Sequence, residues 1–418
     1  MVDTREIGYV VDSSTVTWST LASDVDESNP DLRWPQCIPI YDRMRKEESQ
    51  VKSVLKAVTL PIRSTHWALD PTGVREEVLQ VCADDLGLPI KGRTATPRKR
   101  GRNRFSWSDH LRLALLELPH GHSVFEQAYR IDSAHLARLR KLAWRPPRTI
   151  DKFDVASDGG LEAIWQKGAK KPMGVERLVV YVNEREGGNW AGESLLRSAY
   201  KNWLLKDKIL RSQALTIDRN GLGVPIHEAA PVPEGASAEQ RDAWIKAERE
   251  NGLALAKAFR AGETAGASLN HGAKLTLKGV EGDLPDTDKP IRYHDEQIAR
   301  AVLAHFLNLG TETGSWALGT TFADFFVASL QATATHIADV TQQHVIDDLV
   351  DLNWGEDEPA PQLVFEEIGS KSPATAEAIK QLLDCKAITP DEALEADMRQ
   401  KYGLPVRDRF TARPEVQP

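Results

Sequence analysis

Two pairs of histidines have a spacing that could bring imidazoles together for chemistry. His120 and His122 flank Gly121, and His336 and His344 lie two turns apart on a predicted helix. A metal site would combine such imidazoles with a carboxylate or a thiolate. A pair separated by one residue is more typical of a turn, and no carboxylate completes a set around the helical pair. The histidines therefore favour a structural role over a metal site.

Acidic residues gather where that predicted helix ends. They are Asp347, Asp348, Asp351, Glu356, Asp357 and Glu358. Two-metal nucleases need carboxylates that hold ions about 3.5–4 Å apart, and this spacing favours a solvated turn instead. The sequence also lacks a Gly-x-x-x-x-Gly-Lys phosphate loop, a His-Glu-x-x-His pair and a Gly-x-Ser-x-Gly elbow. We expect no catalytic residue, no metal and no cofactor.

The strongest local charge lies in residues 91–104, which hold seven basic residues and no acid. Arginine and lysine contact phosphates without reading sequence. The same stretch would also suit a flexible surface loop or a contact with an acidic neighbouring subunit, and these interpretations stay open. The candidate contact residues are Arg93, Arg98, Lys99, Arg100, Arg102 and Arg104.

Residues 193–218 form the clearest predicted helix. At about 100° per residue, one broad face is apolar; it comprises Leu195, Leu196, Ala199, Tyr200, Trp203, Leu210 and Ala214. Leu204 interrupts the opposite side, which is basic and comprises Arg197, Lys201, Lys208 and Arg211. The helix is either an ordinary surface helix or one packed against identical helices with its basic edge toward another subunit or a polyanion.

The remaining elements are a mixture of predicted helices and strands, and the fold class expected is α+β. The predicted helices are 41–60 (stopped by Pro61), 74–86, 107–118, 132–142, 237–261 (with Ser237 as N-cap), 295–309, 322–352 and 375–402. The predicted strands are 62–69, 123–131, 161–166, 178–182, 273–279 and 363–365. Residues 1–40 read as an arm that precedes the first regular element, and 310–321 as a loop.

Composition is that of a globular chain of 418 residues, 41% hydrophobic and 27% charged, with a net charge of −8. An acidic chain is not a general polyanion binder, so contact with nucleic acid would need local patches. Cys37, Cys82 and Cys385 are too far apart to suggest a zinc site or a disulfide framework. We find no signal peptide and no apolar run long enough to span a membrane, and we expect a soluble protein made inside the cell.

Several motifs, taken in order, resemble the portal proteins of tailed bacteriophages, particularly those of Mu-like phages. The main segment starts as Gly-Asn-Trp-Ala-Gly-Glu-Ser-Leu-Leu-Arg at 188–197 and ends as Gly-Leu-Gly-Val-Pro at 221–225. Gly-His-Ser-Val-Phe-Glu at 121–126 resembles the family's Gly-x-Ser-x-x-Glu turn, and 291–318 resembles the helix and loop before its long helix. The resemblance covers about 41–368.

The resemblance implies a ring with an axial channel, built from a wing, a helical stem, a clip and a helical crown. The regions it implies are an arm (1–40), wing (41–131 and 220–310), stem helices (132–144 and 190–219), clip (145–189), channel loop (311–321), long wing helix (322–356) and crown or tail (357–418). Ser315 and Trp316 would lie in the channel loop, where they contact DNA or the next subunit; Arg197, Lys201, Lys208 and Arg211 have the same two alternatives.

The resemblance also implies the function. Such a protein is a portal at one capsid vertex of the virion, assembled in the bacterial cytoplasm as a dodecamer and not bound to a membrane. Double-stranded DNA passes through it without sequence specificity. The implied partners are the terminase large subunit, the head–tail adaptor, and the major capsid or scaffolding protein.

Two alternatives remain. A nuclease would use the basic loop to hold its substrate and would cleave DNA with Mg²⁺ or Mn²⁺. A phage structural or scaffolding protein other than a portal would use its apolar helices only for assembly. A closed ring with a channel distinguishes a portal from both.

Overall fold

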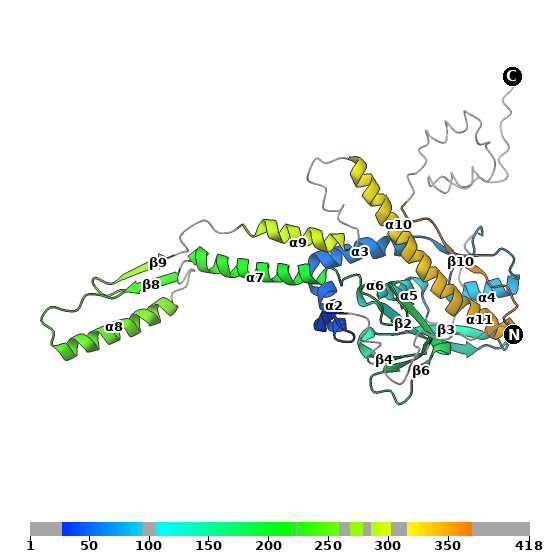
Figure 1. Cartoon of the computed structure of the whole chain (residues 1–418), viewed down its shortest axis with the longest axis horizontal. Helices are drawn as coiled ribbons and strands as arrows, with labels where there is room; N and C mark the ends of the chain where they lie inside the picture. Colours follow the sequence, from blue (N-terminus) through cyan, green and yellow to red (C-terminus); the bar gives the residue numbers. More distant parts are fainter. Residues whose placement is uncertain are drawn as a thin grey trace, which may run out of the picture. The chain divides into compact units, whose positions relative to one another are not determined.

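The computed structural model describes residues 27–93, 105–156, 158–222, 224–258, 268–278, 286–301 and 316–369, with no side chains for 218–222, 224, 258 and 316–323. The chain divides into two compact units, Met1–Glu366 and Glu367–Pro418. The helices and strands below belong to the first unit, and many of them are labelled in Figure 1. The predicted helix at 375–402 lies outside the described residues.

Three helical segments open the described chain: η1 (Pro30–Leu32), α2 (Cys37–Glu47) and α3 (Ser49–Ser64). Glu48 separates α2 from α3 and caps α3, because its carboxylate accepts a hydrogen bond from the Val51 amide at 2.9 Å. The expected arm is therefore wrong for residues 30–40, which fold because the apolar residues among them are buried. Pro61 does not stop the helix; it lies in the last turn of α3, where few backbone bonds remain to be lost.

Strand β1 (Trp67–Asp70) pairs antiparallel with β10 (Gln362–Phe365) and so ties the start of the chain to residues far along it. Its first residue follows α3, so the predicted strand at 62–69 is helical up to Ser64. Helix α4 (Glu76–Leu86) ends at Gly87, whose φ of 63° is the left-handed conformation expected for a C-terminal glycine.

The central sheet has the order β3-β2-β7, with β2 (His122–Ile131), β3 (Ala137–Arg145) and β7 (Leu178–Val182) all antiparallel. Helices α5 (Trp107–Ala114) and α6 (Glu117–His120) precede it. Every residue of β7 is buried. The strands predicted at 123–131 and 178–182 are confirmed.

The helix predicted at 132–142, and with it the stem helix at 132–144, is wrong: this segment is a hairpin turn followed by β3. The Asp132 carboxylate accepts hydrogen bonds from the amides of Ala134 (2.9 Å) and Leu136 (3.0 Å), which closes the turn. Ala137 and Leu139 then point inward at alternate positions, which is the period of a strand.

A second small sheet, β4-β5-β6, consists of β4 (Ile150–Val155), β5 (Leu161–Gln166) and β6 (Met173–Gly174). The short helices η2 (Pro147–Thr149) and η3 (Val175–Arg177) flank it. Ile150, Leu161 and Ile164 pack against Leu178 and Val180 of β7 in one buried cluster. The strand predicted at 161–166 is confirmed.

Helix α7 (Tyr200–Leu222) begins seven residues later than predicted and packs beside α9 (Asp288–Arg300), which begins earlier than predicted. Between them lie β8 (Val224–Glu228), α8 (Ala238–Ala258) and β9 (Lys274–Lys278), with β8 and β9 paired antiparallel. Ser237 is the N-cap of α8, as predicted: its hydroxyl accepts from the Gln240 amide, and the Gln240 side chain accepts from the Ser237 amide.

The predicted long helix is present as three continuous pieces: α10 (Trp316–Thr341), a π-helical segment η5 (Gln342–Asp347) and α11 (Asp348–Trp354). The expected channel loop at 311–321 is wrong for residues 316–321, which are helical; residues 311–315 lie outside the described residues. Helix α10 packs against α3, β7 and β10.

Candidate functional site

Two of the motifs singled out in the sequence meet at the start of β2. Gly121 and Gly192 both have positive φ, 86° and 65°. The Asn183 amide donates to the Gly121 carbonyl at 2.8 Å, and a ring nitrogen of His122 lies 2.8 Å from the Ala191 carbonyl oxygen. We call this contact the glycine junction. The His122 side chain bonds to the backbone just before Gly192. This histidine, which suggested metal chemistry in the sequence, therefore has a structural role.

The residues after Gly192 are attached to α6 instead of forming a helix. The Ser194 hydroxyl donates to the Pro119 carbonyl at 2.7 Å and accepts from the Leu196 amide at 3.1 Å. The Leu195 amide donates to the Leu118 carbonyl at 2.8 Å. These bonds attach residues 194–196 to α6, and regular α-helical structure starts at Tyr200.

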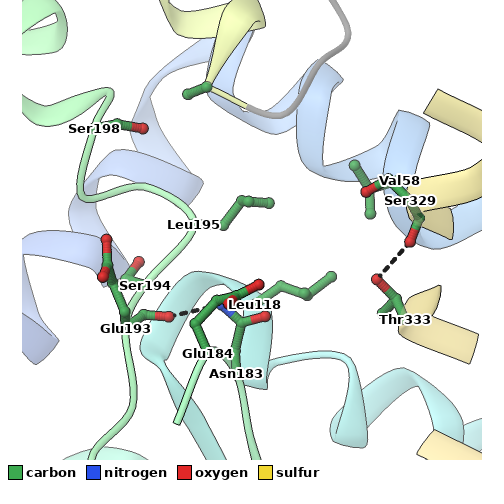
Figure 2. Close-up of a pocket in the computed structure, with 11 residues that line it drawn as sticks. Val58, Leu118, Asn183, Glu184, Glu193, Ser194, Leu195, Ser198, Ser329 and Thr333 are labelled. Atoms are coloured by element: carbon green, nitrogen blue, oxygen red, sulfur yellow. Dashed lines mark hydrogen bonds between the residues drawn. The ribbon is translucent and has the colours of Figure 1, made fainter. Parts of the chain in front are cut away.

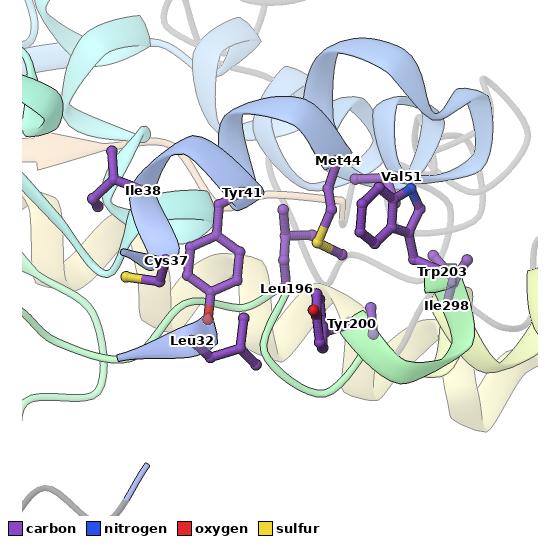
Figure 3. Close-up of a cluster of buried hydrophobic side chains, with 11 residues drawn as sticks. Leu32, Cys37, Ile38, Tyr41, Met44, Val51, Leu196, Tyr200, Trp203 and Ile298 are labelled. Carbon is purple, nitrogen blue, oxygen red and sulfur yellow. The ribbon is translucent and has the colours of Figure 1, made fainter. Parts of the chain in front are cut away.

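The first turn of α7 is anchored in a buried apolar cluster, shown in Figure 3. We call it the root cluster. It joins η1, α2, α3, the start of α7 and α9, and comprises Leu32, Cys37, Ile38, Tyr41, Met44, Val51, Leu196, Ala199, Tyr200, Trp203 and Ile298. Burial of this much apolar surface fixes the direction in which α7 leaves the body of the unit.

A buried ion network continues the root cluster along α7. The Lys206 ammonium lies 2.7 Å from a Glu48 carboxylate oxygen and 2.5 Å from one of Asp295. The Lys206 side chain is only 8% exposed. Burial alone would lower the pKa of Lys206, but the two carboxylates raise it above the usual value. Lys206 thereby connects α7 to both the α3 cap and α9.

Beside the glycine junction is an open hollow of about 260 Å³, drawn in Figure 2. Its lining residues are Val58, Leu118, Asn183, Glu184, Glu193, Ser194, Leu195, Ser198, Ala301, Ser329 and Thr333. Glu184 and Glu193 are exposed, and neither forms an ion pair within the described ranges. Ser194 is the buried hydroxyl of the set, and both of its hydrogen bonds are already made, so it is not an activated nucleophile.

Helix α10 is fixed to the core by two polar contacts. His336 lies 3.2 Å from a carboxylate oxygen of the buried Glu117. Its hydrogen bond to that carboxylate raises the pKa of His336, while burial raises the pKa of Glu117. One turn further on, the Tyr181 hydroxyl lies between His110 (2.8 Å) and Thr341 (2.9 Å). Burial lowers the pKa of His110 to about 3, so this histidine is neutral.

Arg197 was a candidate for DNA or subunit contact, and the structure places it in an internal ion pair. Its guanidinium donates two hydrogen bonds to the Glu27 carboxylate, one of them at 2.8 Å from Nη2. The hydrogen bonds with Glu27 raise the pKa of Arg197. Arg197 therefore helps to hold the start of the described chain against the segment that precedes α7.

The other basic candidates on α7 face solvent. Lys201 and Lys208 are exposed and form no ion pair with any residue that the structure describes. Arg211 is also exposed and pairs with Asp207 at 2.8 Å, one helical turn away. Such an exposed pair contributes little to stability. Lys201, Lys208 and Arg211 remain available for an external partner.

Most of the remaining candidates lie outside the described residues: Ser315, Arg98, Lys99, Arg100, Arg102 and Arg104. Trp316 is the first residue of α10, and its side chain is not among those described. Arg93 pairs with both carboxylate oxygens of Glu76, at 2.7 and 2.8 Å, which raises the pKa of Arg93. Arg93, a member of the basic stretch at 91–104, is therefore bound to the first residue of α4.

Sequence reasoning missed the apolar surface of α7. Leu210, expected on the buried face, is 42% exposed because the root cluster ends at Trp203. The exposed apolar residues of the helix are Leu204, Leu205, Leu210, Leu215 and Ile217. Periodicity could not find this surface, since it lies on more than one side of the helix.

Searches for a metal site and for a membrane span gave no candidate in the described part of the chain. No group of three or more His, Cys, Asp or Glu side chains there is arranged to hold an ion. Within the same residues, no helix combines the length and the apolar character that crossing a bilayer requires.

Known structures with this fold come from a gene transfer agent particle. One is a chain of the virion of the native particle, 12% identical, with a TM-score of 0.52 over 89% of this chain and 94% of that one. Another is a chain from the neck of the native particle, computed with C12 symmetry: 12% identity, TM-score 0.51, 89% and 94% covered. A third is a chain from the neck of the empty particle, computed with C6 symmetry: 13% identity, TM-score 0.51, 87% and 93% covered.

A family model described as the portal protein of Mu bacteriophage matches residues 38–404. The chain belongs to this portal protein family, and its function is that of a capsid portal. The α+β portal fold expected from the sequence is confirmed. The family is a structural one, not a family of enzymes.

Proposed function

We propose that the chain is the repeating subunit of a closed ring of twelve copies at the neck of a phage-like particle, where double-stranded DNA enters and leaves. The family match over residues 38–404 carries this proposal. The C12 and C6 symmetries of the related necks support a ring. In this role the ring sits in the virion, is assembled in the host cytoplasm, and meets terminase, the head–tail adaptor and the major capsid or scaffolding protein.

The structure supports an assignment of stem and clip that differs from the one expected. Helices α7 and α9 lie side by side, joined by Lys206 with Asp295 and by His294 with Asn202 at 3.1 Å. In the chain between them, β8 and β9 pair antiparallel, with Val224 opposite Lys278, and α8 packs on β8. We propose that α7 and α9 are the two stem helices and that β8, α8 and β9 form the clip that docks the adaptor and terminase. The sequence resemblance alone implies a clip at 145–189 instead.

Ring closure in this proposal uses the exposed surface of α7. Leu204 and Leu215 are eleven residues apart, which places them within about 20° of each other around the helix. They are 44% and 55% exposed. Heterologous contacts between identical subunits generate rings when the rotation closes. Packing of these leucines on a neighbouring α7–α9 pair would remove apolar surface from water in every copy.

The test is negative-stain electron microscopy of the purified full chain, with its mass measured in the same buffer. Rings with a central hole wide enough for duplex DNA are expected. The double variant Leu204→Lys/Leu215→Lys should give folded subunits that no longer close into rings. The matched control is Leu60→Lys/Leu352→Lys, which changes two leucines that are 51% and 58% exposed on α3 and α11. A wild-type protein that never forms a ring, even with its particle partners present, would contradict the proposal.

A further inference from the structure

A group of basic side chains lies at one end of the β4-β5-β6 sheet. We call it the basic end; it comprises Arg148, Lys167, Lys170 and Lys171. Arg148 belongs to η2, whereas the lysines lie in the turn between β5 and β6. Strand register brings these segments together, because Ile150 pairs with Gln166 and Ile164 with Met173. No feature of the glycine junction or of α7 uses this region.

The basic end is built on fixed backbone. The Lys167 amide donates to the Thr149 carbonyl at 2.9 Å, and the Gln166 side chain donates to the Thr149 hydroxyl at 3.2 Å. The Ala169 amide donates to the Gln166 carbonyl at 2.9 Å, and Gly168 supplies the positive φ of 78° that the turn needs. The lysines therefore project from a defined turn that η2 holds in place.

The charges of the basic end are not neutralised within the described part of the chain. All four side chains are exposed, and none forms an ion pair there. Nearby cations differ: Lys152 pairs with Asp154 at 2.5 Å, and Arg145 pairs with Glu126. Asp151, next to Ile150 of β4, is an acidic residue at the same end. The result is a local positive excess on a chain whose net charge is −8.

We propose that the basic end binds the phosphate backbone of double-stranded DNA without reading its sequence. The proposal rests on the function proposed above, which brings DNA to the protein. Lysine is depleted at protein–protein interfaces, which favour aromatic anchors, and residues 167–172 contain no aromatic side chain. The absence of an aromatic residue from that turn also disfavours single strands, which bind by base stacking. Clustered lysines and arginines match phosphates, which they contact by charge.

The experiment measures binding of a fluorescently labelled 30-base-pair duplex to the full chain over a range of salt concentrations. The variant is Lys167→Gln/Lys170→Gln/Lys171→Gln, and the control is Lys52→Gln/Lys56→Gln/Lys141→Gln. The control removes the same charge from exposed lysines on α3 and β3 that have no ion pair in the described ranges. The variant should bind DNA at least tenfold more weakly at about 0.1 M salt. The slope of the logarithm of its DNA affinity against the logarithm of salt concentration should fall in magnitude by about 2–3, because each phosphate contact contributes about 0.9 to that slope. The control variant should change the affinity less than threefold.

Three results would overturn the inference. Two are an equal loss of DNA affinity in the two triple variants and no DNA binding by the wild type. The third uses poly-glutamate as a second ligand: if the Lys167 variant loses binding to poly-glutamate but not to DNA, the partner is an acidic protein. Negative-stain images of the same samples separate this inference from the proposed function. Rings with unchanged DNA affinity would remove the basic end as a DNA site and leave the portal function intact. Absence of rings in every sample would argue against the portal function itself.

Discussion

Gly121 and Gly192 approach each other backbone to backbone, so closely that neither position has room for a side chain. A Cβ atom on Gly192 would lie 2.2 Å from the Gly121 carbonyl oxygen, and one on Gly121 would lie 2.4 Å from the Ala191 carbonyl oxygen. Both glycines also have positive φ. The glycine junction therefore depends on glycine twice, for its conformation and for its space. It sets the path of the segment that leads into α7.

The first prediction concerns that space. Gly192→Ala should destabilise the protein by about 2–5 kcal/mol, since a left-handed alanine costs about 1–2 kcal/mol and overpacking about 1–3 kcal/mol. Gly73→Ala is the matched control, because Gly73 has a φ of 78° and nothing within 4 Å of its added Cβ. It should cost about 1 kcal/mol. Chemical denaturation measures both; equal losses would mean that the close approach is not limiting.

The second prediction concerns the ion network of α7. Lys206→Met leaves the Glu48 and Asp295 carboxylates facing each other without a cation, and breaking a buried pair in this way costs about 3 kcal/mol or more. Lys208→Met, on the exposed side of the same helix, should stay within about 0.5 kcal/mol of the wild type. Unfolding free energies of the two variants provide the comparison.

A rescue variant tests the cause of that loss. Adding Glu48→Gln and Asp295→Asn to Lys206→Met removes the unpaired charges and should restore part of the stability, since the cost arises from uncompensated carboxylates.

The same network predicts a pH dependence. The pKa of Lys206 is raised in the folded state, so the contribution of Lys206 to folding stability is fully present below the unfolded pKa of about 10.4 and is lost as pH rises through the folded value. A loss of this contribution at neutral pH would contradict the assignment.

The third prediction concerns pH and the contact of Glu117 with His336. The hydrogen bond to Glu117 raises the pKa of His336, and burial raises the pKa of Glu117. Both folded-state values lie above the unfolded ones, so the folded protein binds more protons. Stability from His336 is fully present below about pH 6.5 and is lost as pH rises through the folded pKa. The contribution of His336, measured as the melting temperature of the wild type minus that of His336→Gln, should therefore fall from pH 6 to pH 8.5. The buried His110, His120 and His122, whose pKa values are lowered by burial, act in the opposite direction on the total stability, so the comparison between variants carries the prediction.

The control for this pH effect is Glu117→Gln. The amide keeps the size of the side chain but removes the charge that favours protonated His336. Between pH 6 and pH 8.5 the melting temperature of this variant should therefore fall less, or rise more, than that of the wild type. His336→Gln should do the same from the other partner. If both variants keep the wild-type slope, other titrating groups cause it.

Local sequence patterns predicted those elements whose signals are local. The buried run of β7, the alternation in β2, the glycine at the end of α4 and the Ser237 cap all depend on residues close in the chain. The segment that became β3 was misread because alanine, leucine, lysine and arginine favour helices in isolation. Pairing with β2 overrode that preference.

Site residues were harder to predict because their partners are distant in sequence. The residues next to Arg197 in the sequence suggest an exposed cation on a helix, but its partner in the folded chain, Glu27, is 170 residues away. The start of α7 was predicted too early because the competing hydrogen bonds come from Leu118 and Pro119. Only the folded chain shows which basic side chains are already paired and which, like Lys208, stay free of ion pairs to the described residues.

The last prediction concerns the π-helical segment η5, whose wider turn leaves backbone groups that side chains must bond. Gln127 on β2 supplies one such bond and a second to the helix that follows: its amide nitrogen donates to the His344 carbonyl of η5 and, at 2.9 Å, to the Asp348 carboxylate of α11. Gln127→Ala should cost about 1–3 kcal/mol and increase amide hydrogen exchange across residues 342–348, because the segment loses its anchor to the sheet. Gln80→Ala is the control, since the one hydrogen bond of the Gln80 side chain among the described residues goes to Asp84 on the exposed face of α4. If exchange in η5 is unchanged in the Gln127 variant, the π-helix is maintained by the chain itself, and β2 is not its anchor.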